Sequence, residues 1–418
     1  MNVALLTVDA LRRDHVGFHG HDRDTTPFLD GFADGGLAAE RAISPSGHTR
    51  EAVPALLTGR PPHAAVDAGY RLATPSVATW LRDAGCATAA VHSNPYLSRA
   101  YGYDAGFDAF DDDLYLGDSK LLALAQRALD RLRGRHYAPG DAITDRALDW
   151  IDDIAGGTGA ASGGDDWFLW AHYMDPHGPY APPDEHARWG DGGDDPDGLY
   201  RRAAVGDPDA VTEDERRTMR DAYDGEIRYV DDCIERFVRG LEDRGLREKT
   251  LIVVTADHGD AFGEHGYYAH PRRLDDELLE VPLVVDGPGV EPGRLDGPVS
   301  TLAVASTVAA AADAPSASEG GDAADVDLRG GVPDGHVAYS SARGEGDEAN
   351  LRRYRATAAV GDARLTVDGD GAVVASDGPE PLLERLRTHA EGGAGAGDVD
   401  GEPSGAVADR LEHLGYRE

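Results

Sequence analysis

The chain has 418 residues, of which 41% are hydrophobic, enough for one large α/β domain and a smaller appendage. Its formal net charge is -37, with 77 acidic against 40 basic residues. A surface this acidic repels nucleic acid phosphates and anionic lipid headgroups, so we expect no nucleic acid partner. It suits a protein dissolved in high salt, where the Debye length shrinks to about 3 Å at 1 M, and it indicates a halophilic, archaeal source.

The N-terminal segment has neither a basic region nor a small-residue cleavage site, and its apolar run, 3–8, is only strand length. No apolar segment reaches the roughly 20 residues that span a bilayer. We therefore expect a cytoplasmic protein without a membrane span. The two cysteines, Cys86 and Cys233, form no disulfide framework and are expected to be buried.

Strand and helix patterns alternate along the first three quarters of the chain. In chain order we expect a strand at 3–8, helices at 27–33, 51–57 and 76–84, a strand at 87–92, helices at 119–133 and 141–154, a strand at 167–173, a helix at 213–246, strands at 251–255 and 281–285, and a helix at 301–312. This alternation predicts an α/β fold with a doubly wound, mostly parallel sheet flanked by helices.

Glycine, aspartate and proline mark the expected irregular segments. They are a loop at 156–166, an irregular excursion at 184–212 and an acidic linker or surface loop at 314–335. We expect a catalytic domain at 1–313 and a small C-terminal α+β subdomain at 336–418. Its antiparallel strands are predicted at 337–340, 353–360, 363–367 and 372–375, its helix at 379–390, and a flexible segment at 391–406.

Three of the predicted strands are followed by residues that can bind metals or protons. Asp9 follows the first strand, Asp175 and His177 follow the strand at 167–173, and Asp257 and His258 follow the strand at 251–255. Ligands in open parallel sheets bind beyond the carboxyl ends of the strands. A carboxylate next to an imidazole makes a divalent metal site, although a helix cap followed by a loop fits Asp257 and His258 equally well.

In order and spacing, these motifs resemble the sulfatase family of the alkaline phosphatase superfamily. The resemblance covers about residues 1–313 and rests on NVALLTVDALRRDH, SPSGHTREAVPALLTGR, HSNPYLS, FLWAHYMDPHGPY and TADHGDAFGEHG. It implies a doubly wound sheet, a metal ion at its carboxyl edge, a covalent intermediate on a hydroxyl nucleophile and a small anionic ester as substrate. The implied metal ligands are Asp9, Thr49, Asp257 and His258.

Thr49 stands at the family's nucleophile position, where sulfatases proper have a cysteine or serine that becomes formylglycine. Threonine cannot give that aldehyde, so we expect no formylglycine. Ala10 stands where many members have a second aspartate, and Val53 replaces the family's arginine. A threonine here would also serve as the N-cap of the helix at 51–57, and the two readings are compatible.

The resemblance also implies roles around the substrate. His177 matches the histidine that binds or protonates the leaving oxygen, and His270 stands roughly where many sulfatases place a lysine. Arg13, Asn94 and His172 are further candidates for binding the substrate. Each has a structural alternative: arginines of such a chain are mostly solvated, Asn94 precedes a proline as in a turn, and His172 lies in a packed neighbourhood.

The mixed oxygen and nitrogen ligands favour Mn²⁺ or Zn²⁺, with Ca²⁺ and Mg²⁺ as alternatives. We therefore expect a metal-dependent hydrolase of sulfate or of phosphate and phosphonate esters that uses Thr49 as nucleophile. A phosphoglycerol-type transferase of the same superfamily is one alternative. A catalytically inactive binding homologue is another, and the departures at Ala10 and Val53 motivate it.

Overall fold

The computed structural model describes residues 1–113, 137–155, 166–190, 195–315, 325–343, 354–361, 363–367, 373–376 and 380–392. Its main feature is a 9-stranded sheet in the order β11-β2-β10-β6-β1-β5-β3-β4, with β9 paired to β2. The strands are β1 Asn2–Val8, β2 Leu37–Ile43, β3 Ala87–Val91, β4 Ala109–Asp111, β5 Trp167–Tyr173, β6 Thr250–Ala256, β9 Glu280–Val281, β10 Leu283–Asp286 and β11 Gly293–Ser300. Strands β4, β3, β5, β1 and β6 are parallel, whereas β10 is antiparallel to both β6 and β2. The predicted doubly wound, mostly parallel sheet is confirmed.

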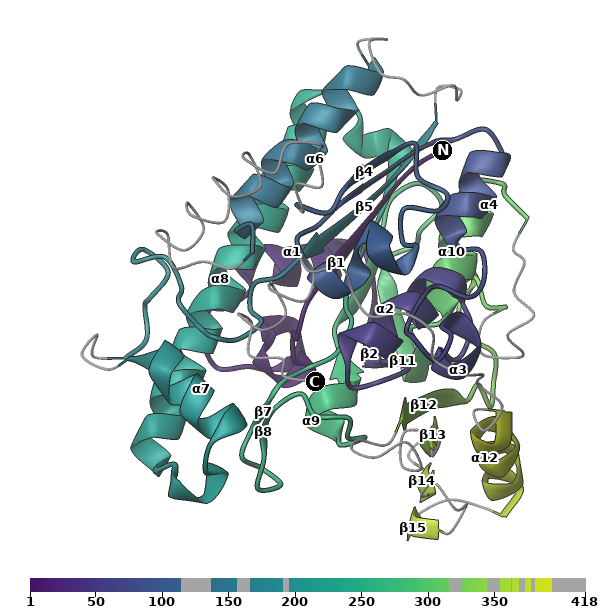
Figure 1. Cartoon of the computed structure of the whole chain (residues 1–418). Helices are drawn as coiled ribbons and strands as arrows, with labels where there is room; N and C mark the ends of the chain where they lie inside the picture. The colour runs from purple at the N-terminus through teal and green to yellow at the C-terminus, as the bar shows by residue number, and fades with distance from the viewer. Residues whose placement is uncertain are drawn as a thin grey trace.

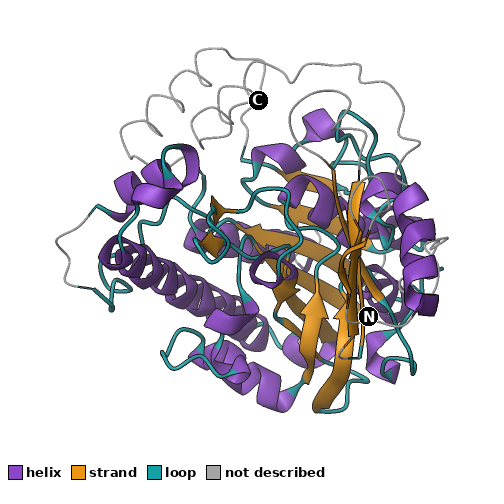
Figure 2. Ribbon diagram, turned by 90° about the horizontal axis from the view of Figure 1, so that it is seen from below, coloured by secondary structure: helices purple, strands orange, loops and turns teal. Residues whose placement is uncertain are grey.

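Helices cover both faces of this sheet (Figures 1 and 2). On one face α6 (Gly140–Ala155) packs against α8 (Glu213–Asp243), which also contacts α1 (Pro27–Gly35). On the other face α10 (Ala303–Ala311) packs against α2 (Thr49–Thr58) and α4 (Val77–Asp83). The shorter helices are α3 Pro62–Ala65, α7 Pro196–Val205 and α9 Asp276–Leu279. No helix in the described part of the chain has the length and apolarity needed to cross a membrane.

The core of the molecule lies between these helices and the central strands. Every residue of β1, β5 and β6 is buried, as expected for parallel strands that are covered on both faces. The helix α8 begins with a capping box, in which the side chain of Thr212 accepts from the backbone of Glu215 and the Glu215 side chain accepts in return. Its apolar residues Ile227, Val230 and Ile234 are fully buried, so helical spacing correctly identified its inner face. Both cysteines are free and buried, as predicted.

Two predictions from local composition were wrong or incomplete. The segment at 184–212, expected to be irregular, contains α7, which begins where Asp195 accepts a hydrogen bond from Gly198 and Pro196 occupies the first turn. The buried Tyr200 anchors this helix with its ring 5.0 Å from that of Tyr180. Strands β2 and β11 were not predicted, because charged and glycine residues interrupt their apolar pattern.

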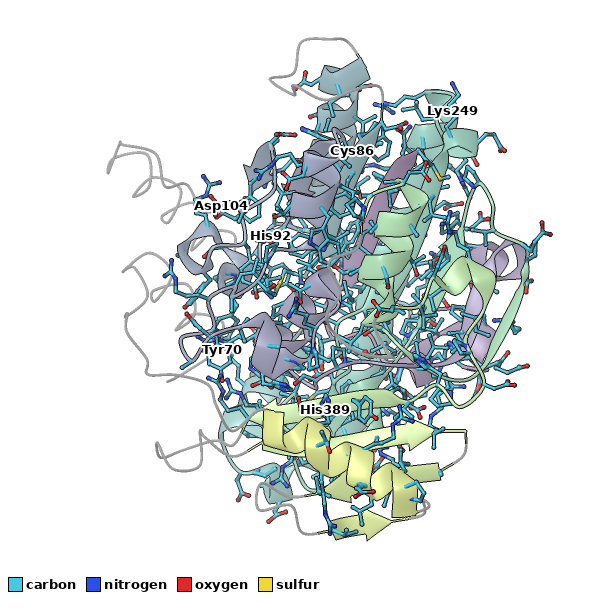
Figure 3. All side chains as sticks on the ribbon, turned by 90° about the vertical axis from the view of Figure 1, so that its right-hand side faces the viewer. Tyr70, Cys86, His92, Asp104, Lys249 and His389 are labelled. Carbon is cyan, nitrogen blue, oxygen red and sulfur yellow. The ribbon has the colours of Figure 1, made fainter. Side chains whose placement is uncertain are left out.

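The C-terminal unit is a 4-stranded antiparallel sheet with one packing helix, as predicted (Figure 1). Its elements are β12 Ala338–Arg343, β13 Tyr354–Val360, β14 Ala363–Val367, β15 Val373–Ser376 and α12 Glu380–Gly392. The helix lies over the sheet (Figure 3). Leu382 and Leu386 belong to the core that the two share. The predicted helix at 119–133, most of the loop at 156–166 and the segment at 393–406 lie outside the described residues.

The C-terminal unit is hydrogen-bonded to the loop that precedes α2. The Ser340 hydroxyl donates to the carbonyl of Ser44 at 2.5 Å, and the Ser341 amide donates to the carbonyl of Pro45 at 2.9 Å. In the segment predicted to be a linker, Val326 and Leu328 are buried in the main core, and Leu328 donates to the Thr307 hydroxyl. The described parts of these segments therefore pack against the large sheet.

Shortening a side chain of β1 should destabilise the whole sheet. Leu5 is fully buried in the central strand, so we expect Leu5→Ala to lower the free energy of unfolding by about 2–5 kcal/mol through lost burial and a residual cavity. Val373→Ala, at an exposed position of the edge strand β15, should change it by less than about 0.5 kcal/mol. Denaturant titration of both variants in high salt checks the difference, and equal effects would contradict it.

Candidate active site

Two aspartates stand at the same level at the carboxyl edge of the sheet. Strands β1 and β6 are in register, with Val8 beside Ala256, so the next residue of each strand is an aspartate: Asp9 and Asp257. Both backbones continue the sheet for one more residue, since Asp9 donates to the Tyr173 carbonyl and Asp257 donates to the Val8 carbonyl. Both side chains are buried. The predicted convergence of the strand ends is thus present in the structure.

Asp9 has one oxygen that is saturated and one that is not. Its Oδ2 accepts from Asn94 Nδ2 at 2.9 Å and lies 3.2 Å from His172 Nε2. Its Oδ1 is buried and has no hydrogen-bond partner among the described residues. Burial alone would raise the pKa of this carboxyl, but the imidazoles of His177, His172 and His258 outweigh it and hold the pKa well below its usual range. The ionised carboxylate therefore presents one free oxygen.

Asp257 repeats this arrangement. Its Oδ1 accepts from the amides of Ala10 at 3.2 Å and His258 at 2.8 Å, while its buried Oδ2 has no hydrogen-bond partner in the part of the chain that the structure describes. Burial and the nearby charge of Asp9 raise the pKa of Asp257. Ala10 reaches Asp257 from a left-handed backbone conformation with φ 58°, which is unfavourable for alanine.

His258 and Thr49 complete the group of four. The Nε2 atom of His258 lies 3.7 Å from Asp9 Oδ1, 3.5 Å from Asp257 Oδ2 and 2.9 Å from the Thr49 hydroxyl. Its Nδ1–H donates to the Gly259 carbonyl at 2.8 Å, which turns the lone pair of Nε2 toward the other three residues. Gly259 is required here, since a Cβ at this position would lie 2.0 Å from the Glu277 carbonyl oxygen.

The four predicted metal ligands therefore meet at one buried point. Two carboxylate oxygens without hydrogen bonds, in a protein interior, are a costly arrangement that a divalent cation would relieve. The donor set of two carboxylate oxygens, an imidazole nitrogen and a hydroxyl oxygen fits such an ion. The residues present thus fit the metal that the motifs predict.

Thr49 is the first residue of α2 and not its N-cap. The cap is His48, whose Nδ1 accepts from the Arg50 amide at 3.2 Å. The alternative reading of Thr49 as a capping residue is wrong, because its hydroxyl is turned toward His258. The sequence offered no signal for His48, whose ring lies 6.5 Å from that of His258 and 5.8 Å from that of His270.

His177 and His270 line the site beside the metal ligands. The ring of His270 lies 4.6 Å from that of His258 and 4.7 Å from that of His177. His177 donates from Nδ1 to the Gly178 carbonyl at 2.5 Å. Burial lowers the pKa of His177, although the negative charge of Asp9 opposes this effect. Both histidines predicted to act on the substrate are therefore within the site.

His270 is held by a carboxylate that the sequence analysis did not single out. Its Nδ1 lies 3.0 Å from Asp260 Oδ1, and the other oxygen of Asp260 accepts from the Tyr180 hydroxyl. Asp260 and Tyr180 are fully buried. The position of Asp260, two residues after His258 in the ADHGDAFG segment, was the available signal. A carboxylate that accepts from Nδ1 fixes the tautomer and the orientation of an imidazole.

The three residues predicted to bind substrate occupy different places. Asn94 and His172 contact Asp9, and His172 also lies 2.8 Å from the Thr7 hydroxyl. One ligand atom each of Asp9, His172 and Asp257 lie within 4.8 Å of one another. Because the Asp9 carboxylate can only accept, His172 donates to it from Nε2, and Nδ1 of the neutral imidazole then accepts from the Thr7 hydroxyl. Both side chains thus orient Asp9.

Arg13 lies apart from this group. Its Nε donates to the Glu40 carbonyl at 2.9 Å, and its guanidinium pairs with Glu280. The short 3₁₀ helix at Arg13–His15 turns Arg13 outward, whereas the preceding Arg12 points inward and donates to the carbonyl of Asp260. The structure therefore does not bring Arg13 to the predicted substrate site.

Comparison with known proteins gives a consistent family. The Sulfatase family model matches residues 1–314. Among curated relatives, the choline-sulfatase of Rhizobium meliloti is 35% identical over 99 residues, covering 24% of this chain and 19% of that protein. The low-salt glycan biosynthesis sulfotransferase of Haloferax volcanii is 44% identical over 72 residues, covering 16% of this chain and 18% of that protein. The matches thus span about a fifth of these relatives.

Solved structures share the fold over nearly the whole chain. The phosphonate monoester hydrolase of Agrobacterium radiobacter superimposes with a TM-score of 0.68 at 18% identity, covering 88% of this chain and 87% of that one. A structure in complex with D-glucosamine-2-N,6-O-disulfate also gives a TM-score of 0.68, at 14% identity, covering 99% and 98%. At these identities the likeness concerns the fold.

Metal binding at this site should depend on pH. Burial lowers the pKa of His258, but the charges of Asp257 and Asp9 outweigh it and raise the pKa above the ordinary 6.5, and the pKa of Asp257 is raised as well. Both groups must lose their protons to bind a metal, so the affinity for Mn²⁺ should fall as the pH falls through the raised pKa of His258, roughly tenfold per unit for each proton displaced.

Calorimetric titration with Mn²⁺ in buffers of different ionisation enthalpy measures the protons released. Asp9→Asn, which removes one of the free carboxylate oxygens, is the matched variant and should bind little metal at any pH. An affinity that does not change with pH in the unsubstituted protein would contradict this assignment of ligands.

Proposed function

Because the chain belongs to the Sulfatase family, we propose that it is a metal-dependent hydrolase of sulfate, phosphate or phosphonate esters with Thr49 as its nucleophile. The observation that carries this proposal is the convergence of the Thr49 hydroxyl with His258 Nε2 and the two free oxygens of Asp9 and Asp257. The same four ligand positions were expected from the sequence, and each is filled by a residue able to bind a cation. This occupancy argues against an inactive homologue.

The metal ion, when bound, would lower the pKa of the Thr49 hydroxyl and balance the charge of the ester. We propose Mn²⁺ or Zn²⁺ on the chemistry of the ligands. Thr49 is held at the start of α2, so its hydroxyl is aimed at the point where the free oxygens of Asp9 and Asp257 converge. Threonine does not require conversion to formylglycine to act as a hydroxyl nucleophile.

His177 and His270 would act on the substrate from the other side of the site. Their rings lie 4.7 Å apart, and each is oriented through its Nδ1, by the Gly178 carbonyl and by Asp260 respectively. We propose that their Nε2 atoms bind the ester oxygens or protonate the leaving oxygen. Asn94 and His172 would act as positioning residues that hold Asp9.

A second candidate is transfer of the sulfuryl or phosphoryl group to an acceptor other than water. The similarity to the sulfotransferase of Haloferax volcanii, at 44% identity over 72 residues, favours it. Both reactions begin with the same attack by Thr49, so they differ only in the molecule that attacks the covalent intermediate. Product analysis in the presence of added alcohols distinguishes them.

Removal of the Thr49 hydroxyl should abolish turnover while leaving the metal in place. With p-nitrophenyl sulfate, p-nitrophenyl phosphate and a phenylphosphonate ester as substrates, we expect Thr49→Ala to lower kcat by about 10³-fold or more. Thr49→Ser should retain activity. Thr58→Ala is the matched control, because Thr58 lies in the same helix and its hydroxyl donates to the Pro54 carbonyl and accepts from the Arg60 amide. Turnover that survives Thr49→Ala would refute the nucleophile assignment.

Loss of the carboxylate at position 260 should impair the reaction without emptying the metal site. Asp260 contacts His270 and Tyr180. We expect Asp260→Asn to lower kcat by about 10- to 100-fold, because the amide can present its NH₂ group to Nδ1 and select the wrong tautomer of His270. Steady-state kinetics with elemental analysis checks this expectation. A variant with normal kcat would show that Asp260 only packs.

A further inference from the structure

A cationic and aromatic cluster lies beside the nucleophile. Arg50 follows Thr49 in α2, and its guanidinium carbon lies 4.0 Å from the ring centre of Tyr70, 4.5 Å from that of Tyr96 and 5.7 Å from that of Tyr101. These distances are typical of cation–π contacts. Figure 3 shows Tyr70 on the part of the molecule that adjoins the C-terminal unit. Three tyrosine rings, one at position 70 and two from the consecutive 3₁₀ turns at 95–101, thus hold one arginine.

Within the described residues, the Arg50 guanidinium makes neither a hydrogen bond nor an ion pair. Its Nε is buried without a hydrogen-bond partner, and its two terminal nitrogens retain contact with solvent. This is unusual in a chain with 77 acidic residues, where other arginines such as Arg12 and Arg247 pair with carboxylates. A guanidinium that stacks on aromatic rings but is not paired with a carboxylate is suited to bind an anion from outside the protein.

Two more arginines strengthen the positive charge of this cluster. The guanidinium of Arg343, from β12, lies 4.5 Å from the ring centre of Tyr70, and that of Arg272 lies 5.4 Å from it. One buried carboxylate, Glu51, stands nearby, with its Oε1 3.7 Å from Arg272 Nε. The described part of the cluster therefore carries more positive than negative charge.

The cluster adjoins the reacting centre through His48. The ring of His48 lies 6.1 Å from that of Tyr96 and 5.8 Å from that of His270. Burial lowers the pKa of His48 well below its usual value, and the charges of Arg272 and Arg50 add to this effect. His48 thus lies between the ring of Tyr96, on which Arg50 stacks, and the ring of His270, so Arg50 and the histidines of the candidate site belong to one continuous wall.

We propose that Arg50, on its tyrosine platform, binds a second anionic group of the substrate, such as a carboxylate, sulfate or phosphate remote from the scissile ester. This inference rests on the proposed function, since it concerns the leaving group of the same reaction. The substrate is then an ester with at least two negative charges. The planar guanidinium would donate paired hydrogen bonds to the second anionic group. An ester without that group offers no anionic acceptor to Arg50.

The test compares two esters that differ by one charge: 4-nitrophenyl and 3-carboxy-4-nitrophenyl esters of the same acid. The unsubstituted protein should give a kcat/KM at least about 10-fold higher for the carboxylated ester. Arg50→Gln should lower kcat/KM for that ester by about 10- to 100-fold and so abolish the preference. Arg247→Gln is the matched control, because Arg247 also stacks on an aromatic ring, Phe32, but lies in the turn before β6, at the opposite end of that strand from the site. Arg50→Lys provides a second variant if Arg50→Gln does not fold.

The failure of this inference is distinguishable from failure of the proposed function. If both esters are hydrolysed equally well, or if Arg50→Gln keeps the preference, the role of Arg50 is overturned and the hydrolase stands. If neither ester is hydrolysed, the proposed function fails, and calorimetric binding of the carboxylated ester decides the inference. The Thr49→Ala variant should then bind this ester at least about 10-fold more tightly than the double variant Thr49→Ala/Arg50→Gln. Equal affinities of the two variants would overturn the proposal.

Discussion

The structure depends on the placement of two buried carboxylates side by side at the edge of a parallel sheet. Asp9 and Asp257 follow adjacent strands in register, and among the described residues each has hydrogen-bond donors at one oxygen and none at the other. Two such groups repel each other in a low-dielectric interior, which is expressed in the raised pKa of Asp257. A bound cation would attract both carboxylates and so offset the repulsion between them.

The surrounding residues can be understood as serving this pair. Asn94 and His172 occupy the second oxygen of Asp9, while the amides of Ala10 and His258 occupy that of Asp257. Four donors from separate elements thus leave the carboxylates little freedom to rotate. The left-handed conformation of Ala10 is part of the cost of this arrangement, because it aims the Ala10 amide at Asp257. Rigid positioning of this kind is what a site needs if its ligands are to be in place before the metal and the substrate arrive.

The sequence predicted the sheet, the order of its long elements and the meeting of the candidate metal ligands at the sheet edge, because these have strong local signals. β1 and β6 are continuous apolar runs, and Asp9, Asp257 and His258 follow them directly. It did not predict β2 or β11, whose pairing depends on distant partners, nor α7, whose Asp-Pro start is embedded in a polar segment. For the candidate site, the sequence did not identify His48 or Asp260, and it wrongly placed Arg13 beside the substrate. Whether a side chain points into the site is decided by the turn that carries it, and composition alone does not report that turn.

The hydrogen bonds from Ser340 and Ser341 to the carbonyls of Ser44 and Pro45 give the C-terminal unit a place in the architecture of the active site. The family match ends at residue 314, yet β12 supports the loop that delivers Thr49, and Arg343 donates to the carbonyl of Ala68 while covering Tyr70. A fragment cut at the boundary of the family match would leave these carbonyls without their donors and the loop that precedes Thr49 without its outer support. The end of the family match is therefore not the end of the structure that supports the candidate site. The C-terminal unit, which lies beyond the family match, thus forms part of the support of the loop that leads to Thr49.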